Sequence, residues 1–598
     1  MASERPVATE MRILFLTRSF NSLAQRLYLD LTAMGHEVAV ELDIADSVAE
    51  EAVALFQPAL VVAPFLKRAI PESVWRRTPC LVVHPGIVGD RGPSALDWAI
   101  TRGVKEWGVT VLQAQAEMDA GPVWASETFA MREATKSSLY RNEVTEAASR
   151  AVCRAVRHFA ATGQAPQLEH AGQDPGPRGE WRRLMRQADR RVDWLQDDTA
   201  TVMRKLHAAD GVPGVLDELF GMPCHLFDAH AEPGWPPGLP RATPGSVVAR
   251  RQHAVLRATR DGAVWIGHAR RVDQADAFKL PAAQAFAQQA AALPAWDLPL
   301  DAPLAMGWRE IHYEAHGAAG VLHFAFYNGA MGTPQCERLN EALRWALAQP
   351  TRVLLLMGGP DFWSNGIHLN LIEAAESPPD ESWRNINAID DVTLTLIQAT
   401  GQLVVAALQG NAGAGGVFMA LAADQVWARP GVVLNPHYKN MGNLHGSEYW
   451  TYLLPRRLGS RPCTEVMEHR LPISAARAAE LGLVDAVFGE ASHGFAQAAL
   501  QRALALAADP ALPAWLHAKQ ARRQADEATR PLVDYRTDEL ARMRRNFYGF
   551  DPSYHIARSN FVRRVLPSWT PRHLAVHRHG VGRVTSVTGP EIDPRQCS

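Results

Sequence analysis

The chain has 598 residues, with 61 Lys and Arg against 63 Asp and Glu, a formal net charge of −2 and 47% hydrophobic residues. At roughly 150 residues per domain, this length predicts about three domains rather than one core. The composition excludes a disordered or fibrous chain, and the near-zero charge argues against a nucleic-acid partner.

The first region, up to about residue 150, alternates apolar runs with helical stretches. The predicted strands are 11–17, 37–42, 59–66 and 81–83, and the predicted helices are 22–34 and 46–56. Strands that alternate with helices predict a parallel, Rossmann-like sheet, whose ligands sit beyond the carboxyl ends of the strands. The first turn lacks a GxGxxG fingerprint, so we expect no dinucleotide site.

A stretch rich in Pro and Gly at 165–180 predicts a linker. Beyond it, short strands predict a small, OB-like β-barrel, with Asp261 and Gly262 as a hairpin turn. The predicted elements are strands 246–249, 254–259 and 263–268 and a helix at 282–292.

The last region, from residue 305, again has the α/β pattern and ends in a helical tail. The predicted elements are strands 320–326, 352–357 and 403–408, a helix at 334–349, a Gly-rich turn leading into an apolar helix over 409–423, and helices over 495–564. Glycines in such a turn allow the backbone to approach a ligand closely.

The six cysteines are scattered, without the spacing of a disulfide framework or a metal site. The first 30 residues lack the sustained apolar core of a signal peptide, and no window approaches the ~20 apolar residues of a membrane span. We therefore expect a cytoplasmic protein that binds neither a membrane nor a metal.

Four short motifs occur in order within residues 81–125: His84, Arg91-Gly92, the triplet 108–110, and Asp119 two residues before Gly121. In this order they resemble the formyltetrahydrofolate-dependent formyltransferases, and the resemblance extends over about residues 11–290. It implies a folate-binding domain at 11–205, a β-barrel domain at 206–292 and 10-formyltetrahydrofolate as the formyl donor.

The resemblance implies acid/base roles for His84 and Asp119, with Arg91 and Gly92 in the folate-binding loop. A carboxylate against an imidazole sets its tautomer and tunes its pKa. The family's Asn, two residues before the His, is Val82 here, so Asn21 after the first strand is the candidate replacement. The alternatives are a loop-stabilising role for His84 and a turn role for Asp119.

Two further segments, 362–373 and 407–428, resemble the crotonase (enoyl-CoA hydratase/isomerase) superfamily and imply such a domain at 305–567. In that superfamily two backbone N–H groups bind the thioester oxygen of a coenzyme A ester. The matching donors here are Ile367 and Gly415, and Asn365, Gly366 and Gly416 belong to the same loops. Two such donors stabilise negative charge that develops on the oxygen.

Both hydratase carboxylates are missing, because Phe418 and His437 stand at their positions. Four other candidates for acid/base chemistry follow in one run: His437, Tyr438, Glu448 and Tyr449. Glu448 aligns with the active-site acid of some crotonase isomerases and hydrolases. The alternatives are a buried structural histidine, a solvated glutamate at a helix start and an aromatic cluster in the core.

The two modules in this order resemble a family of [NiFe]-hydrogenase maturation factors over nearly the whole chain, with the first ~10 residues and the tail after Pro567 peripheral. The resemblance implies formyl transfer from 10-formyltetrahydrofolate to coenzyme A, then release of CO, an iron ligand, from formyl-CoA. Glu448 or His437 would remove the formyl proton, and Tyr438 or Tyr449 would protonate the sulfur.

Two other functions stay open at this point: a formyltransferase that acts on amines, and a non-catalytic scaffold that binds folate and coenzyme A. We expect a monomer rather than a trimer, and other hydrogenase maturation proteins as receivers of the CO. The anionic folate and coenzyme A predict local clusters of Lys and Arg that the net charge of −2 conceals.

Overall fold

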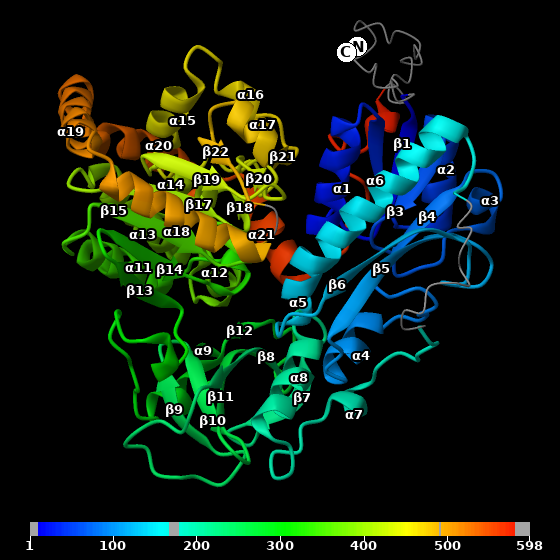
Figure 1. The fold of residues 1–598 in the computed structure, drawn as a ribbon, viewed down its shortest axis with the longest axis horizontal. Helices are drawn as coiled ribbons and strands as arrows, with labels where there is room; N and C mark the ends of the chain where they lie inside the picture. Colours follow the sequence, from blue (N-terminus) through cyan, green and yellow to red (C-terminus); the bar gives the residue numbers. More distant parts are fainter. Residues whose placement is uncertain (1–9, 167–178, 490–491, 580–598) are drawn as a thin grey trace, which may run out of the picture.

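The computed structural model describes residues 10–166, 179–489 and 492–579, so most of the predicted linker at 165–180 lies outside the described residues. Three sheet-containing modules follow one another along the chain (Figure 1). Within the described residues, no helix has both the length and the apolar character that crossing a bilayer requires.

The first module has a six-stranded sheet in the order β2-β1-β3-β4-β5-β6. Its elements are β1 (Arg12–Thr17), α1 (Ser22–Ala33), β2 (Glu37–Leu42), α2 (Asp46–Phe56), β3 (Leu60–Ala63), α3 (Glu72–Trp75), β4 (Cys80–His84), α4 (Ala95–Thr101), β5 (Glu106–Gln113), β6 (Val123–Ala130), α5 (Lys136–Leu139) and α6 (Thr145–Thr162). The predicted strands and helices are confirmed. The sheet is not wholly parallel, however, because β5 and β6 run antiparallel to their neighbours.

The second module has an antiparallel sheet in the order β7-β8-β11-β10-β9, with β12 paired to β11. Its elements are α7 (Gln187–Arg190), α8 (Thr199–Ala209), β7 (Val215–Leu219), β8 (Met222–Glu232), β9 (Val247–Arg251), β10 (Ala254–Ala258), β11 (Ala263–Arg271), β12 (Leu280–Pro281), α9 (Ala282–Ala285) and α10 (Ala287–Ala291). The hairpin at Asp261 and Gly262 joins β10 and β11, as predicted. The predicted helix at 282–292 is two short helices, because Phe286 between them has φ −129°.

The third module has a main sheet in the order β13-β14-β15-β17-β19-β22 and a small sheet β16-β18-β20-β21. Its elements are β13 (Ile311–His316), β14 (Ala319–Phe324), α11 (Thr333–Leu347), β15 (Val353–Gly358), β16 (Phe362–Ser364), α12 (Leu369–Ala374), α13 (Pro378–Gln398), β17 (Leu403–Leu408), β18 (Asn411–Gly413), α14 (Gly415–Leu421), β19 (Gln425–Ala428), β20 (Val433–Asn435), α15 (Trp450–Leu458), α16 (Thr464–Met467), β21 (Ile473–Ser474), α17 (Ala475–Glu480) and β22 (Ala486–Val487). All residues of β15 and β17 are buried, which explains their unbroken apolar runs.

Four helices close the third module, as the tail pattern predicts: α18 (Ser492–Ala508), α19 (Leu512–Thr529), α20 (Leu532–Tyr548) and α21 (Ser553–Arg563). The described residues after Pro567, up to His579, pack against the first module. They return to β2, an edge strand of the first module, where Thr570 and Leu574 accept hydrogen bonds from the backbone of Leu42 and Val40. The segment thereby pairs a sheet edge that would otherwise be open.

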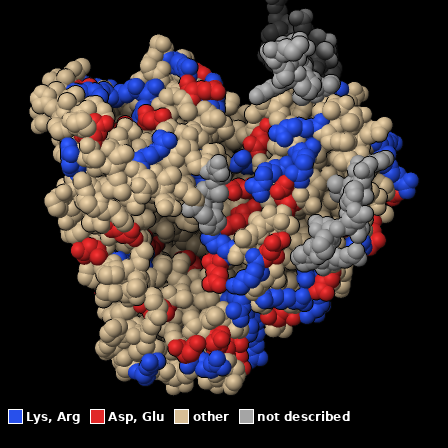
Figure 2. All heavy atoms as spheres, viewed as in Figure 1, with Lys and Arg blue, Asp and Glu red and all other residues tan. Residues whose placement is uncertain are grey.

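Direct contacts join the first and third modules. The carboxylate of Asp361 accepts hydrogen bonds from Ser138 (2.6 Å) and Asn142 (2.9 Å), and Arg141 lies 3.4 Å away. On the face shown in Figure 2, Lys and Arg side chains gather over the first module but alternate with Asp and Glu. Because the charges alternate, a binding site for an anionic ligand must depend on a local group of Lys and Arg side chains rather than on the face as a whole.

Candidate functional sites

His84, the last residue of β4, lies between two carboxylates. Its Nε2 is 3.0 Å from Oδ2 of Asp90, and its Nδ1 is 3.8 Å from Oδ2 of Asp119. All three side chains are buried or nearly so. The structure thus brings the two predicted residues, His84 and Asp119, together at the carboxyl end of a strand.

Asp90, which was not predicted as a site residue, makes the closer contact with His84. Its other oxygen pairs with Arg182 at 2.5 Å, so the carboxylate is held from both sides. Gly86 is needed here, because a Cβ at that position would lie 2.4 Å from Nε2 of His84 and 2.7 Å from Oδ2 of Asp90. Asp90 stands directly before the Arg91-Gly92 motif, and this position in the sequence could have indicated that it belongs to the site.

Asp119 has a left-handed backbone with φ 56°, which is strained for a residue other than Gly and is common at functional sites. Its Oδ2 accepts a hydrogen bond from the backbone N–H of Gly92 at 3.1 Å. Arg91 instead pairs with Glu117 at 2.9 Å. Gly92 therefore positions the Asp119 carboxylate, while the Arg91 side chain is engaged outside the pair.

Asn21, the candidate replacement for the amide lost at Val82, caps helix α1. Its Oδ1 accepts a hydrogen bond from the N–H of Ala24 at 3.0 Å, the usual role of an N-cap asparagine. Its amide oxygen is thus committed to the helix in this structure.

In the third module, the Gly366-Ile367 loop faces the start of helix α14. A Cβ on Gly366 would lie 3.4 Å from the nitrogen of Gly415. In the described part of the chain, the N–H groups of Ile367 and Gly415 donate to no acceptor. Two unpaired amides on facing loops are what a thioester oxygen requires.

The other predicted loop residues hold these two loops in place. Asn365 donates from Nδ2 to the carbonyl of Asn328 at 2.8 Å. The carbonyl of Gly416 accepts from the indole of Trp363 at 2.9 Å. These contacts give Asn365 and Gly416 a positioning role.

Glu448 lies directly against Gly415. A Cβ on that glycine would be 2.0 Å from Oε1 of Glu448, so only glycine leaves room for the carboxylate. The hydroxyl of Tyr438 donates to Oε2 of Glu448 at 2.6 Å, and the Tyr438 ring stacks on Phe418 with centroids 5.4 Å apart. Glu448 is 1% exposed, so it is not a solvated helix-start residue.

Two buried carboxyls fix the backbone that carries Glu448. Glu448 and Tyr449 both have φ 58°. Asp390 accepts from the N–H of Glu448 at 2.8 Å, and Glu539 accepts from the N–H of Tyr449 at 3.0 Å. These bonds compensate for the strain of two successive left-handed residues. Neither Asp390 nor Glu539 was predicted from the sequence, because they lie on distant helices without a motif.

Burial, and to a smaller extent the neighbouring Asp390 carboxyl, raises the pKa of Glu448 to about 8. Burial likewise raises the pKa of Glu539 to about 8. Carboxyl groups with raised pKa values can exchange protons near neutral pH.

The remaining candidates point elsewhere. Burial lowers the pKa of His437 to about 4, the ionisable groups around it are His573, His469 and Arg470, and neither ring nitrogen has a hydrogen-bond partner in the described residues. Burial raises the pKa of Tyr449 to about 12, and its hydroxyl faces Arg536. Of the four candidates, Glu448 and Tyr438 are therefore the pair at Gly415.

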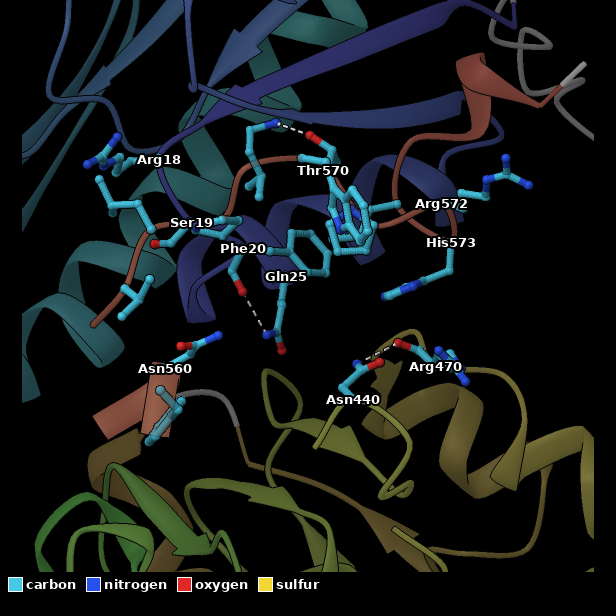
Figure 3. Close-up of a pocket in the computed structure, with 18 of the residues that line it drawn as sticks. Arg18, Ser19, Phe20, Gln25, Asn440, Arg470, Asn560, Thr570, Arg572 and His573 are labelled. Atoms are coloured by element: carbon cyan, nitrogen blue, oxygen red, sulfur yellow. Dashed lines mark hydrogen bonds between the residues drawn. The ribbon is translucent and has the colours of Figure 1, made fainter. Parts of the chain in front are cut away.

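A cavity of about 1750 Å³ lies between the first and third modules (Figure 3). Its walls include Arg18 and Gln25 of the first module and Asn440 and Arg470 of the third. The charged lining side chains are all cationic: Arg18, Lys67, Lys439, Arg470, Arg564, Arg572 and Arg578. This is a local cationic site of the kind that the sequence analysis predicted.

Replacing Gly415 with Ala should strongly slow reactions on a thioester without unfolding the protein. The added methyl group collides with Glu448, so the carboxylate must move away from its position beside Gly415. Displacement of a positioned acid/base group costs about 10²–10⁴-fold in rate. Turnover of a coenzyme A thioester by Gly415→Ala checks this, with Gly401→Ala as the control because a Cβ there meets nothing within 4 Å. Equal losses in both variants would contradict the assignment.

Residues 30–156 match the formyl transferase family, residues 184–285 the formyl transferase C-terminal domain and residues 330–555 the enoyl-CoA hydratase/isomerase family. The chain is 56% identical to the hydrogenase maturation factor HoxX of Bradyrhizobium diazoefficiens, over 95% of this chain and 97% of the relative.

Its fold matches the crystal structure of HypX from Aquifex aeolicus in complex with tetrahydrofolic acid. The TM-score is 0.90 at 48% identity, covering 95% of this chain and 99% of HypX. A variant of the same HypX gives the same TM-score at 47% identity. The likeness therefore spans all three modules and their arrangement.

Proposed function

The chain belongs to the hydrogenase maturation factors of the HoxX and HypX type, which join a formyltransferase to a crotonase-like module, and we propose that it makes carbon monoxide in two steps. The first module transfers the formyl group of 10-formyltetrahydrofolate to coenzyme A. The third module splits formyl-CoA into CO and coenzyme A. The contact between the Glu448 carboxylate and Gly415 carries this proposal.

In the first step, the thiol of coenzyme A attacks the formyl carbon while its proton passes to His84. The C–N bond to folate breaks, and the folate nitrogen takes up the proton. The 3.8 Å gap between Nδ1 of His84 and Asp119 supports this role, since it leaves that nitrogen without a close hydrogen bond. Asp90 holds the opposite nitrogen and sets the tautomer.

In the second step, the N–H groups of Ile367 and Gly415 bind the formyl oxygen and make the formyl C–H more acidic. The Glu448 carboxylate removes that proton, the C–S bond breaks with its electrons going to sulfur, and CO leaves. The proton then returns from Glu448 to the thiolate, with Tyr438 in hydrogen-bond contact throughout.

Exclusion of water favours this outcome over hydrolysis of the thioester. Phe418 stands where a hydratase has a water-activating glutamate, and it packs on Tyr438. Both side chains are buried. The site thus combines a base with apolar walls, which suits elimination of CO.

The cationic cavity between the modules suits coenzyme A, whose phosphates are anionic. Lining residues from both modules would let one bound coenzyme A serve both active sites. Lys and Arg side chains in such a partly enclosed site raise the local concentration of an anionic substrate.

CO release from formyl-CoA should increase with pH. Burial holds the pKa of Glu448 near 8, so its basic form is a minority below that pH. The rate of a reaction that requires this form rises about tenfold per pH unit and levels off above about pH 8. Single-turnover rates between about pH 6 and 9 test this, and a flat or falling rate up to pH 8 would contradict a basic role for Glu448.

Incubation with 10-formyltetrahydrofolate and coenzyme A, followed by detection of CO with a haem reporter, tests the whole proposal. We expect CO only when both substrates are present. Formylation of an added amine without CO would favour an amine formyltransferase instead. Turnover of neither would favour a scaffold.

A further inference from the structure

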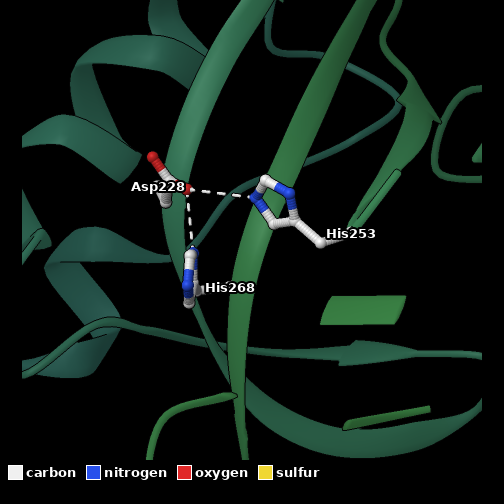
Figure 4. Close-up of side chains that lie close together, drawn as sticks. All are labelled: Asp228, His253 and His268. Carbon is white, nitrogen blue, oxygen red and sulfur yellow. Dashed lines mark hydrogen bonds and ion pairs between the residues drawn. The ribbon is translucent and has the colours of Figure 1, made fainter. Parts of the chain in front are cut away.

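Three polar side chains from separate parts of the second module converge on one point (Figure 4). They are Asp228 of β8, His253 in the turn between β9 and β10, and His268 of β11, and we call them the Asp-His-His triad. Oδ2 of Asp228 is 2.8 Å from Nδ1 of His268 and 4.0 Å from Nε2 of His253. Each side chain is more than nine-tenths buried.

The two imidazole rings lie close together without stacking face to face, and one ligand atom from each residue of the triad lies within 4.8 Å of the others. The rings are inclined by 57°, with centroids 5.4 Å apart, and ring-nitrogen lone pairs lie in the ring planes. Both nitrogens of His253 face carboxylates, with Nδ1 3.3 Å from Glu310 and Nε2 4.0 Å from Asp228, but within the described residues neither meets hydrogen-bond geometry. A buried imidazole without a well-formed hydrogen bond is unfavourable unless a proton shared with these carboxylates or a metal ion satisfies it.

The backbone is shaped to place the carboxylate here. Asp228 lies inside a strand and yet has φ 58°, a strained conformation for a residue other than Gly. Gly267 on the neighbouring strand leaves the space that the carboxylate occupies, since a Cβ there would be 2.0 Å from Oδ2 of Asp228.

Further polar groups hold the triad from behind. Oδ1 of Asp228 is 2.8 Å from Nε2 of His230, and Nδ1 of His253 is 3.3 Å from Oε2 of Glu310. Glu310 in turn pairs with Arg338 at 2.5 Å. A carboxylate behind a histidine and a hydrogen bond to the distal oxygen of a carboxylate are the usual supports of metal ligands.

We propose that the Asp-His-His triad binds one divalent transition-metal ion of the Zn²⁺ type. Ligand atoms around a tetrahedral ion lie about 3.3 Å apart, and the two distances from Asp228, 2.8 and 4.0 Å, bracket that value. All the ion-pair partners of Asp228 in the described chain are histidines. A metal ion would neutralise the buried Asp228 carboxylate and bind all three side chains. A single proton shared within the triad would instead place a positive charge on only one of the two histidines.

A second group of potential ligands, His312, Glu314 and His323, fits an ion less well. The two imidazoles stack nearly parallel, with an interplanar angle of 6° and centroids 4.3 Å apart. In-plane lone pairs on parallel rings do not converge on one ion. This group therefore supplies the matched control.

The test is to load the full chain with Zn²⁺, dialyse it and measure the metal by mass spectrometry. We expect about one Zn²⁺ per chain, and a visible spectrum typical of a four-coordinate N/O site when Co²⁺ replaces it. No stoichiometric metal in the wild-type chain would overturn the proposal and favour a proton in this place. This measurement does not depend on any variant being able to fold.

Variants then locate the ion. Asp228→Asn and His268→Ala should lose the metal, and Glu310→Gln should weaken its binding by about 10–100-fold. The double variant His312→Ala, His323→Ala should keep it. Loss of the metal from that control, or full retention in Asp228→Asn, would overturn the assignment to the triad.

Discussion

Glutamine in place of Glu448 is expected to lower the rate of CO release from formyl-CoA by about 10²–10⁴-fold, the usual contribution of a general base. Glutamine keeps the shape of the side chain and can still accept the hydrogen bond from Tyr438, so the oxyanion loops stay in place. It cannot take the formyl proton. The measurement is single-turnover CO release from supplied formyl-CoA, which bypasses the first module.

The loss of activity should come without a loss of stability. A carboxyl whose pKa is raised to about 8 in the folded protein, against about 4.3 when unfolded, destabilises the fold increasingly as the pH rises through that window. Glu448→Gln removes this penalty, so it should be at least as stable as the wild type at pH 8. An inactive variant that is also clearly less stable would point to a structural role for Glu448.

Replacing His84 with Gln should have the complementary effect. Formyl transfer from 10-formyltetrahydrofolate to coenzyme A should fall by about 10²–10⁴-fold, because glutamine cannot shuttle a proton between thiol and folate. CO release from supplied formyl-CoA should remain unchanged, since that site lies in the third module.

His36→Gln is the matched control, because His36 is also buried in the first module and has no hydrogen-bond partner for its ring in the described residues. It should leave formyl transfer intact. If His84→Gln transferred formyl groups as well as His36→Gln does, His84 would have no catalytic role.

Much of the fold was predictable because its determinants are local. The alternation of apolar runs and helices placed the first four strands, and Asp261-Gly262 placed a hairpin. The antiparallel β5 and β6 and the return of Thr570 to β2 were not predictable. Long-range pairing leaves no short-range pattern, and so the tail after Pro567 looked peripheral.

The site residues divide in the same way into those marked by a local sequence pattern and those brought together only by the fold. His84, Asp119, Gly415 and Glu448 were predicted as site residues because each lies in a motif or an unusual run. Asp390 and Glu539 hold the Glu448 backbone from helices α13 and α20, and the Asp-His-His triad draws on two strands and a turn. Such groups are defined by tertiary packing, and nothing in their sequence spacing indicates them.

Trapping of formyl-CoA tests the central claim most directly. Glu448→Gln is incubated with coenzyme A and 10-formyltetrahydrofolate labelled with ¹³C in the formyl group, and the products are analysed by mass spectrometry. We predict that labelled formyl-CoA accumulates and that adding the His84→Gln variant converts it to labelled CO. If the wild type makes labelled CO while Glu448→Gln forms no formyl-CoA, the two-step account is contradicted.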